Sequence, residues 1–234
     1  TPVYTKQGTT IASDHTDVDA AVNYILNLRH VGKVSMVAWS LGGPRAGGYT
    51  AAHPDKVQKL VLLAPAYARN TSGTAPANVP ADGAPFNTQS REEFVANWDR
   101  QVGCPNQYDP AALDSIWSDM MASDPVGATW GTGVRRAPNT TNWGWSSAVV
   151  AKMQTPTLMV SGVHDKQVNP MNVNDLYTDI GSKQKVLINL TCASHAAMWE
   201  RGHLILFKAS LEWLSKGTVN GKQDGVFQMG IETK

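Results

Sequence analysis

One serine in this sequence stands where a nucleophile is well placed. Val34–Ala38 predicts a short buried strand, and the next residues, Trp39–Gly43, lead into a segment of small residues that predicts a helix from about Pro44. Ser40 therefore lies at a turn between a strand and a helix. A serine hydroxyl is a poor nucleophile unless a base removes its proton, and a sharp strand-to-helix turn is the arrangement that exposes the hydroxyl best.

The neighbours of Ser40 suit that turn. The serine has to adopt a strained backbone conformation, so the residues two before and two after it must be small, as Ala38 and Gly42 are. The helix N-terminus behind the serine supplies positive partial charge. We expect the backbone N–H of Leu41 to be one donor to an oxyanion formed during attack.

A carboxylate and an imidazole follow two later strands. Thr157–Ser161 predicts a buried strand, and the turn after it contains Asp165 in the phrase Ser-Gly-Val-His-Asp-Lys-Gln-Val. Lys185–Leu190 predicts another strand, and His195 follows it in Thr-Cys-Ala-Ser-His, before a helix over about Glu200–Ser215.

Together these three segments resemble the serine α/β-hydrolase family of lidded esterases and related acyl hydrolases. The family's motif is Gly-x-Ser-x-Gly, and Ala38 replaces its first glycine here. The triad of that family runs in the order serine, acid, histidine. The resemblance therefore implies Ser40 as nucleophile, Asp165 as acid and His195 as base.

The resemblance also implies a reaction and a pocket. Ser40 would attack an ester carbonyl while His195 takes its proton, and Asp165 would hold the imidazole in the useful tautomer. Trp39 and Trp199 flank the nucleophile and the base, so we expect them to line the substrate pocket. Five tryptophans of the middle segment are expected mainly to bury that segment against the sheet: Trp98, Trp117, Trp130, Trp143 and Trp145.

Other functions remain open on the same residues. An acyltransferase uses the same triad with an alcohol or thiol in place of water, and a non-catalytic binding module could share the fold. Peptidase, lactonase and carbon–carbon hydrolase activities are also compatible with the triad. No phosphate-binding loop, dinucleotide motif or His-Glu-x-x-His occurs in the sequence, so we expect no cofactor and no metal.

The elements that position these residues alternate between helix and strand, which predicts an α/β fold with a mostly parallel sheet flanked by helices. We expect the core in residues 1–65 and 153–216, a largely helical lid insertion in 66–152, and a C-terminal hairpin or loose extension in 217–234. In the resembled family further strands precede the helix at 17–29. We therefore expect an N-terminal fragment, or a longer parent chain, to complete the sheet beside Val34–Ala38 and to supply the second oxyanion donor.

The composition narrows the kinds of partner that the protein can bind. Apolar residues make up 42% and charged residues 17%, and 20 basic against 19 acidic residues give a formal charge of +1. These values exclude the electrostatic pattern of a nucleic-acid binder, and no apolar run is long enough to span a membrane. We expect a small-molecule ester as the ligand.

The two cysteines, Cys104 and Cys192, have no metal-type spacing. They could pair with each other, but we expect two buried thiols. The low charge and the abundance of Thr, Asn, Gly and Trp favour an exported or periplasmic protein over a cytoplasmic one.

Overall fold

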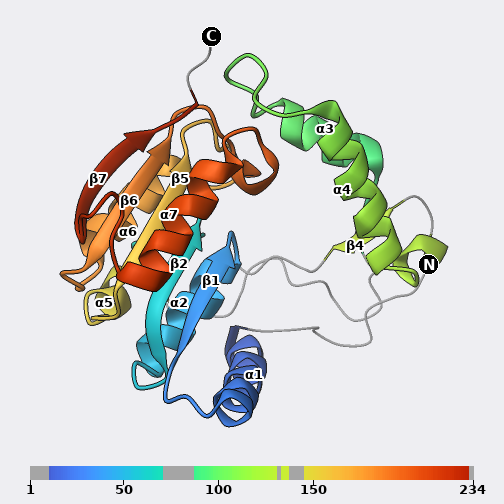
Figure 1. Ribbon diagram of the computed structural model, residues 1–234. Coiled ribbons are helices and arrows are strands. Elements are labelled where there is room, and N and C mark those ends of the chain that lie inside the picture. The colour runs from blue at the N-terminus through green and yellow to red at the C-terminus, as the bar shows by residue number, and fades with distance from the viewer. Residues whose placement is uncertain (1–10, 71–86, 131–132, 137–144, 232–234) are drawn as a thin grey trace.

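A five-stranded parallel sheet forms the centre of the molecule (Figure 1). The computed structural model describes residues 11–70, 87–130, 133–136 and 145–231. The strand order is β1-β2-β5-β6-β7, and every neighbouring pair is parallel. The strands are β1 (Val34–Trp39), β2 (Val57–Leu63), β5 (Thr157–Gly162), β6 (Lys185–Leu190) and β7 (Asp224–Met229). This confirms the predicted α/β class.

Helices cover both faces of this sheet (Figure 1). On one face lie α1 (Ile11–Arg29), α2 (Gly42–Ala52), α5 (Ser147–Val150) and α6 (Pro170–Asp179), and on the other lies α7 (His203–Lys216). Alternate residues of each strand meet alternate faces: Leu60 and Leu62 pack with α2 and α6, whereas Val61 and Leu63 pack with α7. Burial on both faces explains the unbroken apolar runs of the central strands.

The expected insertion, residues 66–152, runs between β2 and β5. Among its described residues are α3 (Arg91–Asp99), α4 (Pro110–Ser123), the short 3₁₀ helix η1 (Gly127–Trp130), and the antiparallel pair β3 (Asn87–Gln89) and β4 (Val134–Arg136). The side chain and backbone of Ser90 and Glu93 form a reciprocal capping box that fixes the start of α3. The function of this insertion as a lid stays a prediction.

The expected hairpin or loose extension at residues 217–234 is wrong for most of this segment. Gly217, in the left-handed region at φ 72°, ends α7, and a single antiparallel bridge joins Val219 to Lys222. The chain then enters β7, which pairs with β6 along its whole length. Because β7 is an edge strand with exposed alternate residues, it lacks the apolar run that marks a buried strand.

Two helix starts also differ from the pattern. The helix expected at 17–29 already includes Ile11, because α1 spans Ile11–Arg29. The helix expected from Glu200 begins at His203, because a 3₁₀ turn, η2 (Ala197–Trp199), comes first. This later start leaves the Glu200 side chain free to turn back toward the loop that follows β6.

Candidate active site

Ser40 occupies the turn between β1 and α2 in a left-handed conformation, with φ at 56°. This region is costly for a residue with a β-carbon and persists only where surrounding contacts impose it. Here the Ser40 N–H donates to the Leu63 carbonyl at 3.0 Å, and the Ser40 carbonyl accepts from Gly43 at 2.9 Å and Ala66 at 3.0 Å. The backbone thus has the strained strand-to-helix geometry that the sequence predicted for a nucleophile.

Small residues around Ser40 are required by close packing. A β-carbon on Gly42 would lie 3.2 Å from that of Ala38, and one on Gly43 would lie 2.6 Å from that of Pro65. The alanine at position 38 is therefore accommodated, whereas any side chain on Gly43 would collide with the end of β2. Leu41 stands at the N-terminus of α2, where the first N–H groups have no partner within the helix. Its amide is in the place expected of an oxyanion donor, and that role stays a prediction.

The structure brings Asp165 and His195 into direct contact. The His195 Nδ1 lies 2.8 Å from the Asp165 Oδ2, and both residues are buried. The other carboxylate oxygen, Oδ1, accepts the backbone N–H groups of Gln167 at 2.7 Å and Val168 at 2.8 Å. With Oδ1 held in this way, Oδ2 faces the imidazole, and Nε2 is the ring nitrogen left for a proton transfer.

Trp39 joins the nucleophile turn to the histidine loop. Its indole Nε1 donates to the backbone carbonyl of His195 at 2.9 Å. The Trp39 ring centroid lies 5.2 Å from the His195 ring and 5.3 Å from the Trp199 ring. The two tryptophans expected at the pocket therefore lie against each other, and Trp39 also lies against His195.

A pocket of about 350 Å³ opens over Ser40 and His195, a size typical of small-molecule sites. Apolar and polar side chains both line it. The apolar ones are Trp39, Leu41, Phe94, Trp98, Met120 and Trp199, and the polar ones include Arg45, Gln89, Asn97, Gln101 and Gln167. Helices α3 and α4 of the insertion therefore contribute directly to the wall of the pocket.

The tryptophans of the insertion divide between pocket and core. Trp98 lines the pocket, although the tryptophans of the insertion are expected mainly to bury it against the sheet. Trp145 is fully buried in the core beside Tyr67, and Trp117 packs against Phe94. Trp143 and the side chain of Trp130 lie outside the described residues.

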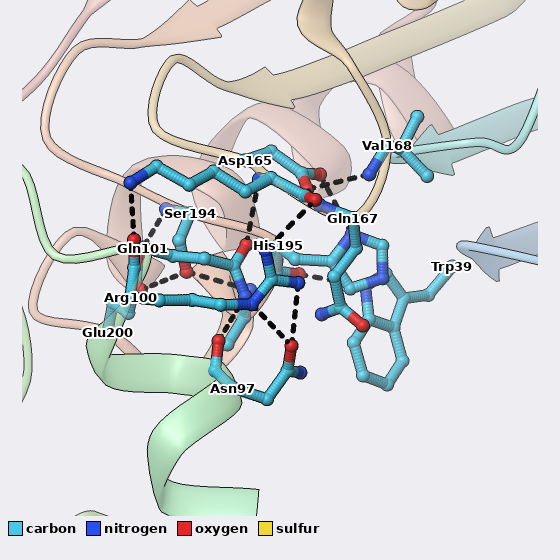
Figure 2. A network of polar contacts seen from close by, with 12 residues as sticks. Trp39, Asn97, Arg100, Gln101, Asp165, Gln167, Val168, Ser194, His195 and Glu200 are labelled. Carbon is cyan, nitrogen blue, oxygen red and sulfur yellow. Dashed lines mark hydrogen bonds and ion pairs between the residues drawn. The ribbon is translucent and has the colours of Figure 1, made fainter.

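Glu200 is a site residue that the sequence did not reveal. It is 1% exposed, and its carboxylate accepts hydrogen bonds from Trp98, Gln107 and Ser194. Figure 2 shows Glu200 and Ser194 beside His195, together with Asn97 of α3 and with Arg100 and Gln101, which follow that helix. No pattern signalled it, because Glu200 looked like the first residue of an ordinary helix.

A disulfide joins Cys104 to Cys192, so the expected pair of free thiols is wrong. The sequence separation is 88 residues, and only the fold brings the two cysteines together. The bond ties the loop after α3 to the loop that carries His195.

The described residues contain no group of His, Cys, Asp and Glu side chains arranged to hold a metal ion. None of the described helices is long and apolar enough to cross a membrane.

One protein-family model matches most of the chain. The model of the Hydrolase_4 family, described as serine aminopeptidase, S33, matches residues 9–202. No curated protein matches the chain.

Solved structures share the fold at low sequence identity. A monoacylglycerol lipase from Paleococcus ferrophilus has a TM-score of 0.59 and 16% identity, over 90% of this chain and 77% of the lipase. A serine hydrolase involved in carbazole degradation has a TM-score of 0.54 and 22% identity, over 84% of this chain and 70% of that one. The structure described for the metagenome-derived lipolytic enzymes LipS and LipT has a TM-score of 0.54 and 15% identity, over 89% and 74% of the two chains.

Proposed function

Since this chain belongs to the Hydrolase_4 family (serine aminopeptidase, S33) and is a serine hydrolase of the α/β fold, we propose that it cleaves small carboxylic esters through Ser40, His195 and Asp165. One observation carries the proposal. Ser40, in its left-handed turn, and His195, bonded to Asp165, line the same pocket.

In the proposed reaction, Ser40 Oγ attacks the ester carbonyl while His195 Nε2 takes the hydroxyl proton. The proton then passes to the leaving alcohol, and an acyl-enzyme on Ser40 remains. Asp165 holds Nδ1–H toward itself, which fixes the tautomer and stabilises the imidazolium. Water, deprotonated by His195, attacks the acyl-enzyme and releases the acid. The Leu41 N–H donates to the oxyanion in both steps.

The pocket supports a small substrate with both apolar and polar parts. Its volume of about 350 Å³ limits the ester to a compact acyl group. Phe94, Met120 and Trp199 offer apolar contact, while Asn97 and Gln167 offer hydrogen bonds. We expect short acyl chains to react faster than long ones.

A substrate series tests the proposal. p-Nitrophenyl esters of rising chain length should be hydrolysed by the full-length protein and not by Ser40→Ala. Aminoacyl p-nitroanilides should be assayed in parallel as peptidase substrates, because the family description names an aminopeptidase. Faster cleavage of the anilides would overturn the ester assignment, and equal activity of Ser40→Ala would overturn the mechanism. An added alcohol acceptor separates hydrolysis from acyl transfer by the products formed.

We further propose that an N-terminal polypeptide pairs beside β1. β1 is the edge strand of the described sheet, and Val37 on it is 65% exposed. A groove of about 260 Å³ runs along this edge, lined almost entirely by apolar residues that include Leu206 and Phe207 of α7. An open apolar edge favours aggregation, so a strand from a longer parent chain, or from a bound fragment, should cover it.

Expression of residues 1–234 with and without the upstream polypeptide tests this pairing. The chain alone should aggregate or be inactive, and the upstream polypeptide should restore activity. A Val37→Lys substitution in the full-length protein should weaken the pairing, because it places a charge in the apolar groove. A monomeric and fully active 1–234 would exclude the proposal.

The disulfide supports export from the cytoplasm. Disulfides persist mainly in oxidising compartments, and this one lies beside the catalytic loop. We propose a periplasmic or secreted location. Fractionation of the natural host, with thiol labelling under denaturing conditions, tests it; reduced protein in the cytoplasmic fraction would contradict it.

A further inference from the structure

We propose that Glu200 is a positioning residue through which the insertion holds His195 in its working position. The part of the insertion concerned is residues 98–107, here called the clamp segment. The inference rests on the proposed function, since it assigns His195 as the base. It adds a role for the insertion beyond forming a wall of the pocket.

The Glu200 carboxylate collects donors from two separate parts of the chain. Its Oε1 accepts from Trp98 Nε1 at 3.0 Å and from Gln107 Nε2 at 2.9 Å, both in the clamp segment. The same oxygen accepts from Ser194 Oγ at 2.5 Å, while Oε2 accepts from the Ser194 backbone N–H at 2.8 Å. All four donors are neutral N–H or O–H groups, and together they give both oxygens of this buried carboxyl group a hydrogen-bond partner.

Ser194 carries this constraint to His195, the next residue. Its hydroxyl donates to Glu200 and also accepts the backbone N–H of Ala196 at 3.2 Å. The backbone on both sides of His195 is therefore tied to one carboxylate. A shift of Glu200 would shift the loop and, with it, the imidazole.

The clamp segment also holds the acid loop. The Lys166 backbone N–H donates to Gln101 Oε1 at 3.0 Å. Gly103 packs so closely on His164 that a β-carbon there would lie 2.2 Å from the ring. The disulfide from Cys104 adds a covalent link to the histidine loop. One short segment thus contacts the loops of both Asp165 and His195, and Figure 2 shows Gln101 near the first loop and Glu200 near the second.

Glu200→Gln in the full-length protein is the primary test. The amide places an NH₂ group where one carboxylate oxygen stood, and in either orientation that group faces a donor of Ser194 or of the clamp segment. We expect kcat for a p-nitrophenyl ester to fall roughly 10- to 100-fold, as for a small misplacement of a catalytic group. KM should change less than about threefold, because the Glu200 side chain does not line the pocket.

Glu212→Gln is the matched control. Glu212, on α7, also accepts hydrogen bonds from three residues, Thr218, Asn220 and Gly221. That variant should keep the wild-type kcat. The rate of phosphonate labelling of Ser40 should fall in Glu200→Gln and not in Glu212→Gln, because labelling depends on the same base.

A second variant covers the case in which Glu200→Gln does not fold. Gln107→Met removes one donor of the clamp segment without altering the pocket lining. It should lower kcat about threefold to tenfold, with KM unchanged. In the double variant the two losses should be less than additive, since both act through one carboxylate.

Two results would contradict the proposal, and a third would contradict the proposed function on which it rests. Wild-type kcat in folded Glu200→Gln, or in Gln107→Met where Glu200→Gln is unfolded, would overturn it. A loss of thermal stability with no loss of kcat would assign Glu200 a structural role only. Wild-type protein that neither cleaves esters nor reacts with a phosphonate would refute the proposed function instead. The low-field NMR signal of the His195 Nδ1–H would then still report whether Glu200→Gln disturbs the contact with Asp165.

Discussion

The indole of Trp39 donates a hydrogen bond to the backbone carbonyl of His195, so the residue before the proposed nucleophile is bonded to the proposed base. The two residues are far apart in the sequence, and this bond links the turn that carries Ser40 to the loop that carries His195. Nothing in the serine motif itself requires a tryptophan at this position.

Trp39→Phe should lower kcat/KM about fivefold, because it keeps the aromatic contact and removes one hydrogen bond worth about 1 kcal/mol. The loss should be similar for esters of different chain length, since the bond acts on the base and not on the acyl group. Steady-state kinetics over the ester series checks this. A loss confined to one chain length would show that the ring acts only as a pocket wall.

Asp165→Asn should leave the fold intact and lower kcat by roughly 10⁴-fold. The Oδ1 atom of residue 165 accepts the N–H groups of Gln167 and Val168, so an amide would keep its oxygen there and turn its NH₂ group toward His195. The imidazole would then have to accept at Nδ1 and carry its proton on Nε2, where it cannot act as a base. Wild-type kcat in this variant would contradict the assigned acid.

Removing the disulfide should destabilise the protein. The bond closes a loop spanning 88 residues, and the loss of loop-closure entropy limits its contribution to the free energy of unfolding to about 4.6 kcal/mol. Cys104→Ala/Cys192→Ala should therefore melt at a lower temperature than the oxidised wild type. Reduced wild type should match the double variant. A Tm that does not change on reduction would mean that the bond does not form in solution.

Asp19 should contribute stability that is lost in acid. Hydrogen bonds from Lys56 and then Tyr49 lower the pKa of Asp19 to about 2, below the value of about 3.9 of an unfolded chain. Its contribution is therefore complete above about pH 4 and disappears as the pH falls toward 2. Asp19→Asn should lower Tm at pH 6, and the difference from wild type should shrink on acidification.

Asp119→Asn, at an exposed position on α4, is the control for that titration. It should leave Tm close to the wild-type value from pH 6 to pH 2. A Tm difference for Asp19→Asn that stays constant over this range would show that its contacts with Lys56 and Tyr49 do not depend on its charge.

The sequence was informative where chemistry constrains local pattern. Ser40, Asp165 and His195 each follow a strand of the parallel sheet, and such a sheet brings the ends of its strands to one edge. β2, β5 and β6 each contain a run of three or four consecutive apolar residues because both faces of the sheet are covered, so the positions of these strands could be read directly.

What the sequence did not reveal depends on contacts between distant segments. Glu200 accepts hydrogen bonds from Trp98 and Gln107 of the insertion. The disulfide likewise joins Cys104 of the insertion to Cys192 of the core. Neither pairing leaves a local pattern. β7 was missed for a different reason, since an edge strand with exposed alternate residues has little apolar signal.

Mass spectrometry of the protein after reaction with a fluorophosphonate tests the central claim most directly. The account predicts one modified residue, Ser40, with labelling strongly slowed in His195→Gln and absent in Ser40→Ala. Modification of another serine in the native wild type, or an undiminished labelling rate in His195→Gln, would contradict it.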